Sequence, residues 1–172
     1  MSEHRDVVAE VPASLQEPFR SALVAAADAW IADWGERLIS IVLFGSVARR
    51  QAAPVSDIDL LLVAERLPHA MADRRRPFLE SWNRTRAAHA LPHVEWNLVT
   101  KPPHEAQIRS PLYLDLVEDG ILILDRNRFF ESVLSAMRDR MRALGSRRVY
   151  LQDGTWYWDL KPDFRFGEVV DL

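Results

Sequence analysis

Three runs of mostly apolar residues along the first hundred positions predict the strands of a β-sheet. The runs at 39–44 and 58–63 are almost continuously apolar, which is typical of strands that are buried on both faces. A third segment alternates between apolar and polar positions from Val94 to Leu98, so Glu95 and Asn97 share one face. These patterns predict a small sheet with a largely buried interior.

Apolar residues at helical spacing predict the helices that cover this sheet. The stripe within Leu15–Trp34 marks the first helix, with Ser14 as its cap and Glu17 at the capping-box position, although Pro18 allows a later start. Further helices are expected at about 71–90, with Pro77 as a possible true start, and at 111–120 and 128–144, with a fourth strand at 121–124. The last of these helices carries an apolar stripe of Phe129, Val133, Met137 and Met141.

The final segment predicts an aromatic β-hairpin around the turn at Asp153-Gly154. Its tryptophans, Trp156 and Trp158, could cover an exposed edge of the core, or they could dock a partner or position an acceptor. The fold class expected is α/β (α+β), with a small mixed sheet, flanking helices and a C-terminal hairpin tail. We expect one domain over 1–172, with its core at about 14–125 and the C-terminal helix and hairpin at about 128–172.

Composition narrows the possible functions. The chain has 172 residues, no cysteine and a formal net charge of −3. Without cysteine, thiol catalysis, disulfides and cysteine-based zinc sites are excluded. The negative charge makes nucleic acid an unlikely partner, because such binders normally carry a positive field. No apolar run is long enough for a membrane span, and a cytoplasmic location is expected.

A phosphate site is predicted where the first strand ends in Gly45-Ser46. A strand that turns there into a short helix presents backbone N–H groups and a hydroxyl to an anion. Gly45 has no Cβ and lets the backbone approach a phosphate closely, while Arg49, one turn later, could add a charge-assisted contact. The pattern therefore indicates phosphate binding.

A metal site is predicted beside it. Ser56-Asp57-Ile58-Asp59 opens the second strand, and alternation places Asp57 and Asp59 on the same face. Two adjacent carboxylates repel each other unless a cation lies between them, and Mg²⁺ with a nucleoside triphosphate fits that need. Glu95, in the middle of the alternating strand, is the candidate third carboxylate of a two-metal site, although it could instead be a surface residue or pair with an arginine.

The combined motif, Gly45-Ser46-x10-Asp57-x-Asp59 with a later acidic residue on a strand, resembles the DNA polymerase beta-type nucleotidyltransferase superfamily and its minimal nucleotidyltransferase (MNT) branch. The resemblance implies that Gly45 and Ser46 bind the triphosphate and that Asp57, Asp59 and Glu95 hold Mg²⁺. It also implies transfer of a nucleotidyl group, AMP from ATP, to a hydroxyl acceptor. In this branch the acceptor can be a tyrosine of a helical HEPN-type toxin.

The chain departs from the pattern of this family at two positions. Arg50 stands where members often carry glycine after the Ala-Arg pair, and Glu95 replaces the more frequent Asp. Two alternative functions stay open: an enzyme that modifies a small molecule of the aminoglycoside type, and a non-catalytic antitoxin that acts by docking. The short segment after Thr100 argues against a full second domain of the kind that aminoglycoside-modifying enzymes often have.

Overall fold

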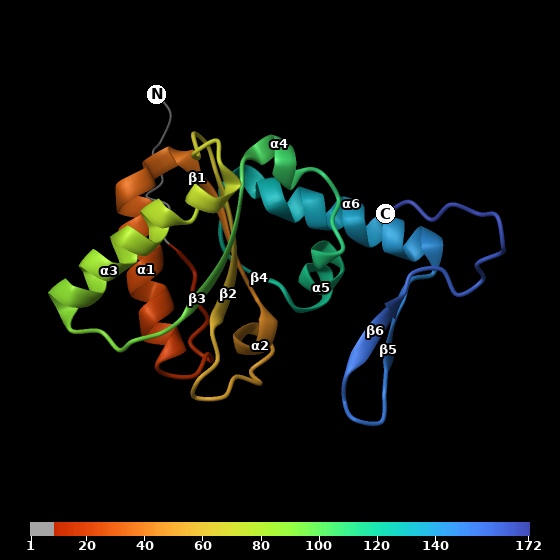
Figure 1. Ribbon diagram of the computed structural model, residues 1–172, viewed down its shortest axis with the longest axis horizontal. Helices are drawn as coiled ribbons and strands as arrows, with labels where there is room; N and C mark the ends of the chain where they lie inside the picture. Colours follow the sequence, from red (N-terminus) through yellow and green to blue (C-terminus); the bar gives the residue numbers. More distant parts are fainter. Residues whose placement is uncertain (1–8) are drawn as a thin grey trace.

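A four-stranded mixed sheet organises the computed structural model, which describes residues 9–172 (Figure 1). Residues 1–8 of the expected domain lie outside that range. The strands are β1 (Leu38–Phe44), β2 (Ile58–Ala64), β3 (Trp96–Lys101) and β4 (Ile121–Asp125), in the order β3-β2-β1-β4. β1 runs antiparallel to both β2 and β4, whereas β3 runs parallel to β2. The predicted mixed sheet with flanking helices is confirmed.

Helices cover both faces of the sheet, which explains why the two central strands are almost continuously apolar. Helices α1 (Phe19–Trp34) and α3 (Arg76–His89) pack together on one face, over residues such as Ile41 and Leu60. Helices α5 (Leu112–Asp119) and α6 (Phe129–Leu144) pack on the other face, over Val42 and Leu61. Neighbouring strand residues therefore belong to different cores, because strand side chains alternate.

Shorter elements connect these layers. They are η1 (Gly35–Arg37), α2 (Gly45–Ala48), η2 (Met71–Asp73), α4 (Pro103–Ala106) and η3 (Arg126–Arg128). The predicted hairpin is formed by β5 (Arg147–Tyr150) and β6 (Trp156–Asp159), which pair antiparallel and extend from the end of α6 (Figure 1). Within residues 9–172, we find no helix with both the length and the apolar character to cross a membrane.

The structure corrects the predicted cap of the first helix and selects the later of the two starts expected for the second. Ser14 does not cap α1, because the helix begins only after Pro18, and the Ser14 hydroxyl instead accepts a hydrogen bond from Arg50 at 2.8 Å. Helix α3 begins at Arg76, with Pro77 in its first turn, and the preceding residues form η2. In both cases a proline marks the true start, with Pro18 directly before α1 and Pro77 in the first turn of α3.

The buried face of α6 also differs from the predicted one. Phe130 and Leu134 are buried together with the expected Met137 and Met141, whereas Phe129 and Val133 are only partly buried. The buried positions follow a spacing of four, three and four residues, which keeps them on one face, whereas a strict series of every fourth residue drifts around the helix. The Asp125 carboxylate accepts hydrogen bonds from the backbone N–H groups of Phe130 and Glu131, both at 2.9 Å.

Asp125 is the basis of a stability prediction. Its carboxylate also accepts a 2.7 Å hydrogen bond from Ser40, whose side chain is fully buried in β1. Asp125→Ala would remove the helix cap and leave the Ser40 hydroxyl unpaired, so we expect a loss of about 2–3 kcal/mol in the free energy of unfolding. Urea denaturation checks this value, with the exposed Asp139→Ala as control, and an unchanged midpoint would contradict it.

Candidate active site

Gly45 begins the turn after β1, at a position where any other residue would overlap the Asp59 side chain. Its φ of +72° lies in the left-handed region. A Cβ at this position would lie 1.9 Å from Oδ2 of Asp59, because β1 and β2 pair Phe44 with Asp59. The turn at Gly45 and the Asp59 carboxylate are therefore in direct contact, and glycine is needed there for both its conformation and its lack of a side chain.

The turn continues into α2, a single helical turn that includes Ser46 and leads to Arg49. The backbone N–H of Gln51 donates to the Ser46 carbonyl at 2.9 Å, which closes the turn. Arg50, which follows Arg49, adopts a φ of +58°, a conformation that glycine adopts at little cost. The departure from the family pattern at position 50 thus places an arginine in a backbone conformation suited to glycine.

The carboxylate pair lies at the start of β2. Asp57 is exposed, one residue before the strand, and Asp59 is half-buried within it. Burial raises the pKa of Asp59, and the nearby Asp57 charge raises it further. A hydrogen bond from Asn97 and the positive charge of Arg49 act in the opposite direction on this pKa. The charged form of the Asp59 carboxylate is therefore unfavourable unless a cation binds beside it.

Asn97 is the side chain that sequence reasoning missed at this site. The parallel register of β2 and β3 pairs Asp59 with Asn97, and the Asn97 amide donates to Oδ1 of Asp59 at 2.7 Å. The alternating pattern had placed Asn97 on the same face as Glu95. That shared face was the available signal, although alternation alone does not give the register between strands.

Glu95 lies one residue before β3. Its backbone is hydrogen-bonded to β2 between Asp57 and Asp59, but its side chain contacts His93. Its carbonyl accepts the N–H of Ile58 at 2.9 Å, while its exposed carboxylate contacts the ring of His93 at 2.6 Å. Within residues 9–172, no three His, Cys, Asp or Glu side chains converge in a way that could hold a metal ion. The role of Glu95 as third ligand stays a prediction.

Ser56 and Arg49 complete the set of predicted residues. The Ser56 hydroxyl accepts a hydrogen bond from the N–H of Ala53 at 2.9 Å, so in this structure it ties the loop before β2. Arg49 extends from the end of α2 toward Asp119, with 3.9 Å between Nη1 and the Oδ2 atom. The positive charge of Arg49 lowers the pKa of Asp59, so the guanidinium lies within electrostatic range of that carboxylate.

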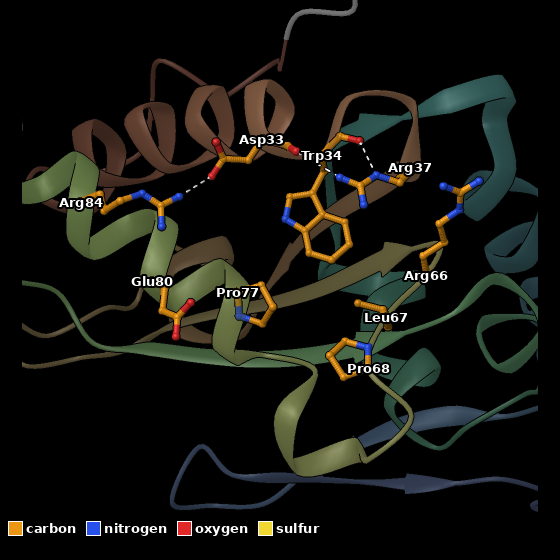
Figure 2. A pocket seen from close by; sticks show the side chains of 9 residues that line it. All are labelled: Asp33, Trp34, Arg37, Arg66, Leu67, Pro68, Pro77, Glu80 and Arg84. Atoms are coloured by element: carbon orange, nitrogen blue, oxygen red, sulfur yellow. Dashed lines mark hydrogen bonds and ion pairs between the residues drawn. The ribbon is translucent and has the colours of Figure 1, made fainter.

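A separate hollow of about 450 Å³ lies between α1, α3 and the loop after β2 (Figure 2). Trp34 and Arg37 line it from before β1, and Arg66 and Pro68 line it from after β2. Because β1 and β2 are antiparallel, these residues lie at the opposite end of the strands from Gly45 and Asp59. The hollow is therefore distinct from the carboxylate site.

Comparison with other proteins identifies the family. Residues 26–132 match the nucleotidyltransferase domain, a span that contains β1, α2, β2 and β3. The chain belongs to the nucleotidyltransferase domain family. Every residue predicted for the site lies within the matched span of this nucleotidyltransferase, whereas the β5–β6 hairpin lies beyond it. The resemblance to polymerase beta-type nucleotidyltransferases is confirmed.

A relative from Methanocaldococcus jannaschii, provisionally named a protein adenylyltransferase, is 30% identical to the nucleotidyltransferase over 109 residues. The match covers 61% of this chain and 71% of the relative. Among solved structures, a chain of a toxin–antitoxin complex with AMP-PNP is similar at a TM-score of 0.45 and 17% identity, over 73% of this chain and 91% of that one.

A second similar structure contains a tri-AMPylated Shewanella oneidensis HEPN toxin with its MNT antitoxin. It matches at a TM-score of 0.41 and 16% identity, over 72% of this chain and 92% of that one. Family membership rests on the domain match and on the M. jannaschii relative.

Proposed function

We propose that this nucleotidyltransferase transfers AMP from MgATP to a hydroxyl group on a protein. The observation that carries the proposal is the contact between Gly45 and Asp59, which joins a phosphate-binding turn to a carboxylate pair. The acceptor class is supported by the name of the M. jannaschii relative. Within that class, the MNT-type motif favours a helical HEPN-type toxin as the partner.

The donor set of the site fits Mg²⁺. Asp57 and Asp59 supply carboxylate oxygens, and Mg²⁺ is commonly bound by one or two carboxylates together with phosphate and water oxygens. The raised pKa of Asp59 indicates a carboxylate whose charge would be stabilised by a cation. Mg²⁺ bound there would neutralise charge on the triphosphate and on the leaving pyrophosphate.

The chain's own residues have the remaining roles. Gly45 and Ser46 would bind the phosphates through the turn, with Ser56 supporting the loop and Arg49 adding positive charge. Ile58 pairs with Trp96, so Glu95 lies beside Asp57 in the register. Rotation of the Glu95 side chain away from His93 would bring a third carboxylate to the pair and complete a two-metal site.

In the reaction, the oxygen of the acceptor hydroxyl attacks the α-phosphorus of ATP, and the bond to the β-phosphate oxygen breaks. Pyrophosphate leaves, and we assign the hydroxyl proton to the Glu95 carboxylate. The acceptor thereby gains AMP through a new oxygen–phosphorus bond. Positioning and charge neutralisation supply most of the catalysis in reactions of this kind.

Calorimetric titration of MgATP tests the proposal. We expect the wild type to bind only when Mg²⁺ is present, and Asp57→Asn/Asp59→Asn to lose this binding because it lacks both metal-binding carboxylates. The double variant Asp139→Asn/Asp163→Asn, with two exposed carboxylates changed, controls for charge and should bind like the wild type.

Transfer itself would be measured with ATP labelled at the α-phosphate and a candidate HEPN-type partner. Label on a partner tyrosine would support the proposal. MgATP binding without transfer, combined with intact neutralisation of the partner by the double aspartate variant, would favour docking alone. An absence of MgATP binding by the wild type would overturn the enzymatic proposal.

A further inference from the structure

The β5–β6 hairpin reaches the phosphate turn, although it lies outside the span matched by the family. The guanidinium carbon of Arg49 lies 4.9 Å from the centre of the Trp156 ring. The same guanidinium faces Asp119, at the end of α5. The side chain that leaves the turn is therefore held between a helix and the hairpin.

Trp156 is itself anchored in this position. Arg148, on the paired strand β5, lies 4.8 Å from the Trp156 ring and 5.1 Å from the Trp158 ring. Its side chain is only 10% exposed, and it binds Asp115 at 3.1 Å and Asp119 at 2.9 Å. Two carboxylates of α5 thus fix an arginine, and that arginine fixes the indole against which Arg49 rests.

Trp158 strengthens the same connection. Its indole N–H donates to Asp115 at 3.0 Å, and its ring packs against the core on the α6 side of the sheet. Covering the edge of the core, which was one of the two roles considered for the tryptophans, thus accounts for Trp158. Trp156 instead contacts two arginines.

Restraint of Arg49 would be useful for phosphate binding. A free arginine has many rotamers, and ordering it on a ligand reduces the binding free energy that its contacts supply. Stacking on an indole fixes the plane of the guanidinium and leaves N–H groups for an oxyanion. The Arg49 side chain is 23% exposed, so it is restrained but still accessible to a ligand.

We propose that Trp156 and Asp119 are positioning residues that hold Arg49 ready for the triphosphate, and that the hairpin is thereby part of the nucleotide site. This inference rests on the proposed function, because it takes the triphosphate as the ligand of Arg49. It extends the site beyond the family-matched span to β6 and the end of α5.

A double-mutant cycle measured by MgATP calorimetry tests the inference. We expect Trp156→Ala to weaken binding about fivefold, the size of one cation–π contact, and Trp156→Phe to restore most of that loss. In an Arg49→Ala background, Trp156→Ala should have no further effect, because its action runs through Arg49. Tyr157→Ala, at an exposed neighbouring position of β6, is the matched control and should bind normally.

Several results would overturn the inference. Unchanged affinity in Trp156→Ala, or the same fivefold loss with and without Arg49, would contradict it. If Trp156→Ala does not fold, as judged by circular dichroism, Asp119→Asn serves in its place with an expected loss of about threefold. If the wild-type protein binds neither MgATP nor magnesium tripolyphosphate, the proposed function is overturned as well. If the wild type binds but the effects of Trp156→Ala and Arg49→Ala are additive, only the role of the hairpin is overturned.

Discussion

Gly45→Ala is expected to reduce nucleotidyl transfer at least ~100-fold, because even small displacements of catalytic groups cost on that order. The new methyl group would lie 1.9 Å from Oδ2 and 3.1 Å from Cβ of Asp59, so the carboxylate has to leave its position. The φ of +72° adds backbone strain of about 1–2 kcal/mol. Initial rates of AMP transfer at saturating MgATP measure the loss.

Gly145→Ala is the matched control for this substitution. Gly145 follows α6 with a φ of +69°, and a Cβ there would meet nothing closer than Pro162 at 3.9 Å. It therefore carries the same backbone strain without a displaced carboxylate, and its activity should stay close to that of the wild type. If both alanine variants lost activity equally, strain alone would be responsible and the proposed link between turn and carboxylate would be wrong.

Asp59→Asn is expected to abolish transfer, by roughly 1,000-fold or more in kcat, and to stabilise the metal-free protein. Activity falls because the amide is a poor Mg²⁺ ligand and cannot neutralise the ion. Stability rises because the charge that is buried beside Asp57 is removed, while the new amide oxygen can still accept the hydrogen bond from Asn97. Thermal unfolding should show a gain of a few degrees, since each kcal/mol corresponds to about 2–4 °C in a chain of this size.

The pH dependence of unfolding gives a second test with a defined sign. The pKa of Asp59 is raised above its ordinary value of 3.8, so the folded state binds its proton more tightly than the unfolded state. The contribution of Asp59 to stability is therefore fully present below that value and is lost as pH rises through the folded pKa. Asp59→Asn should remove this fall in metal-free protein, whereas the control Asp139→Asn should retain it. A less stable Asp59→Asn variant at neutral pH would contradict the account.

The sheet and the turn at Gly45-Ser46 could be predicted from sequence because their signals are local. Apolar runs defined β1 and β2. The Gly45-Ser46 turn follows the first run, and the Asp57-x-Asp59 pair lies at the start of the second. The partner of Asp59 on β3 could not be predicted in this way. Alternation shows which face Glu95 and Asn97 share, but the register between two strands distant in sequence depends on tertiary packing.

Other features depend on contacts that no short window of sequence contains. The face of α6 that is buried, with Phe130 and Leu134, depends on how the helix packs against the sheet and α5. The contact between Arg49 and Trp156 depends on how α5 and the hairpin pack together. Local patterns identified both segments of that contact, but only the folded chain brings them together.

The central position of β2 in the sheet determines how rarely the backbone around Asp59 opens to solvent. This strand is paired on both edges and almost entirely buried on both faces, so its amide hydrogens should exchange with solvent only on global unfolding. The two-stranded β5–β6 hairpin has neither protection and should open far more often. Asp59 would then keep its position during openings of the hairpin that release Trp156. Hydrogen exchange should therefore be slow for the amides of β2 and much faster for those of β5 and β6.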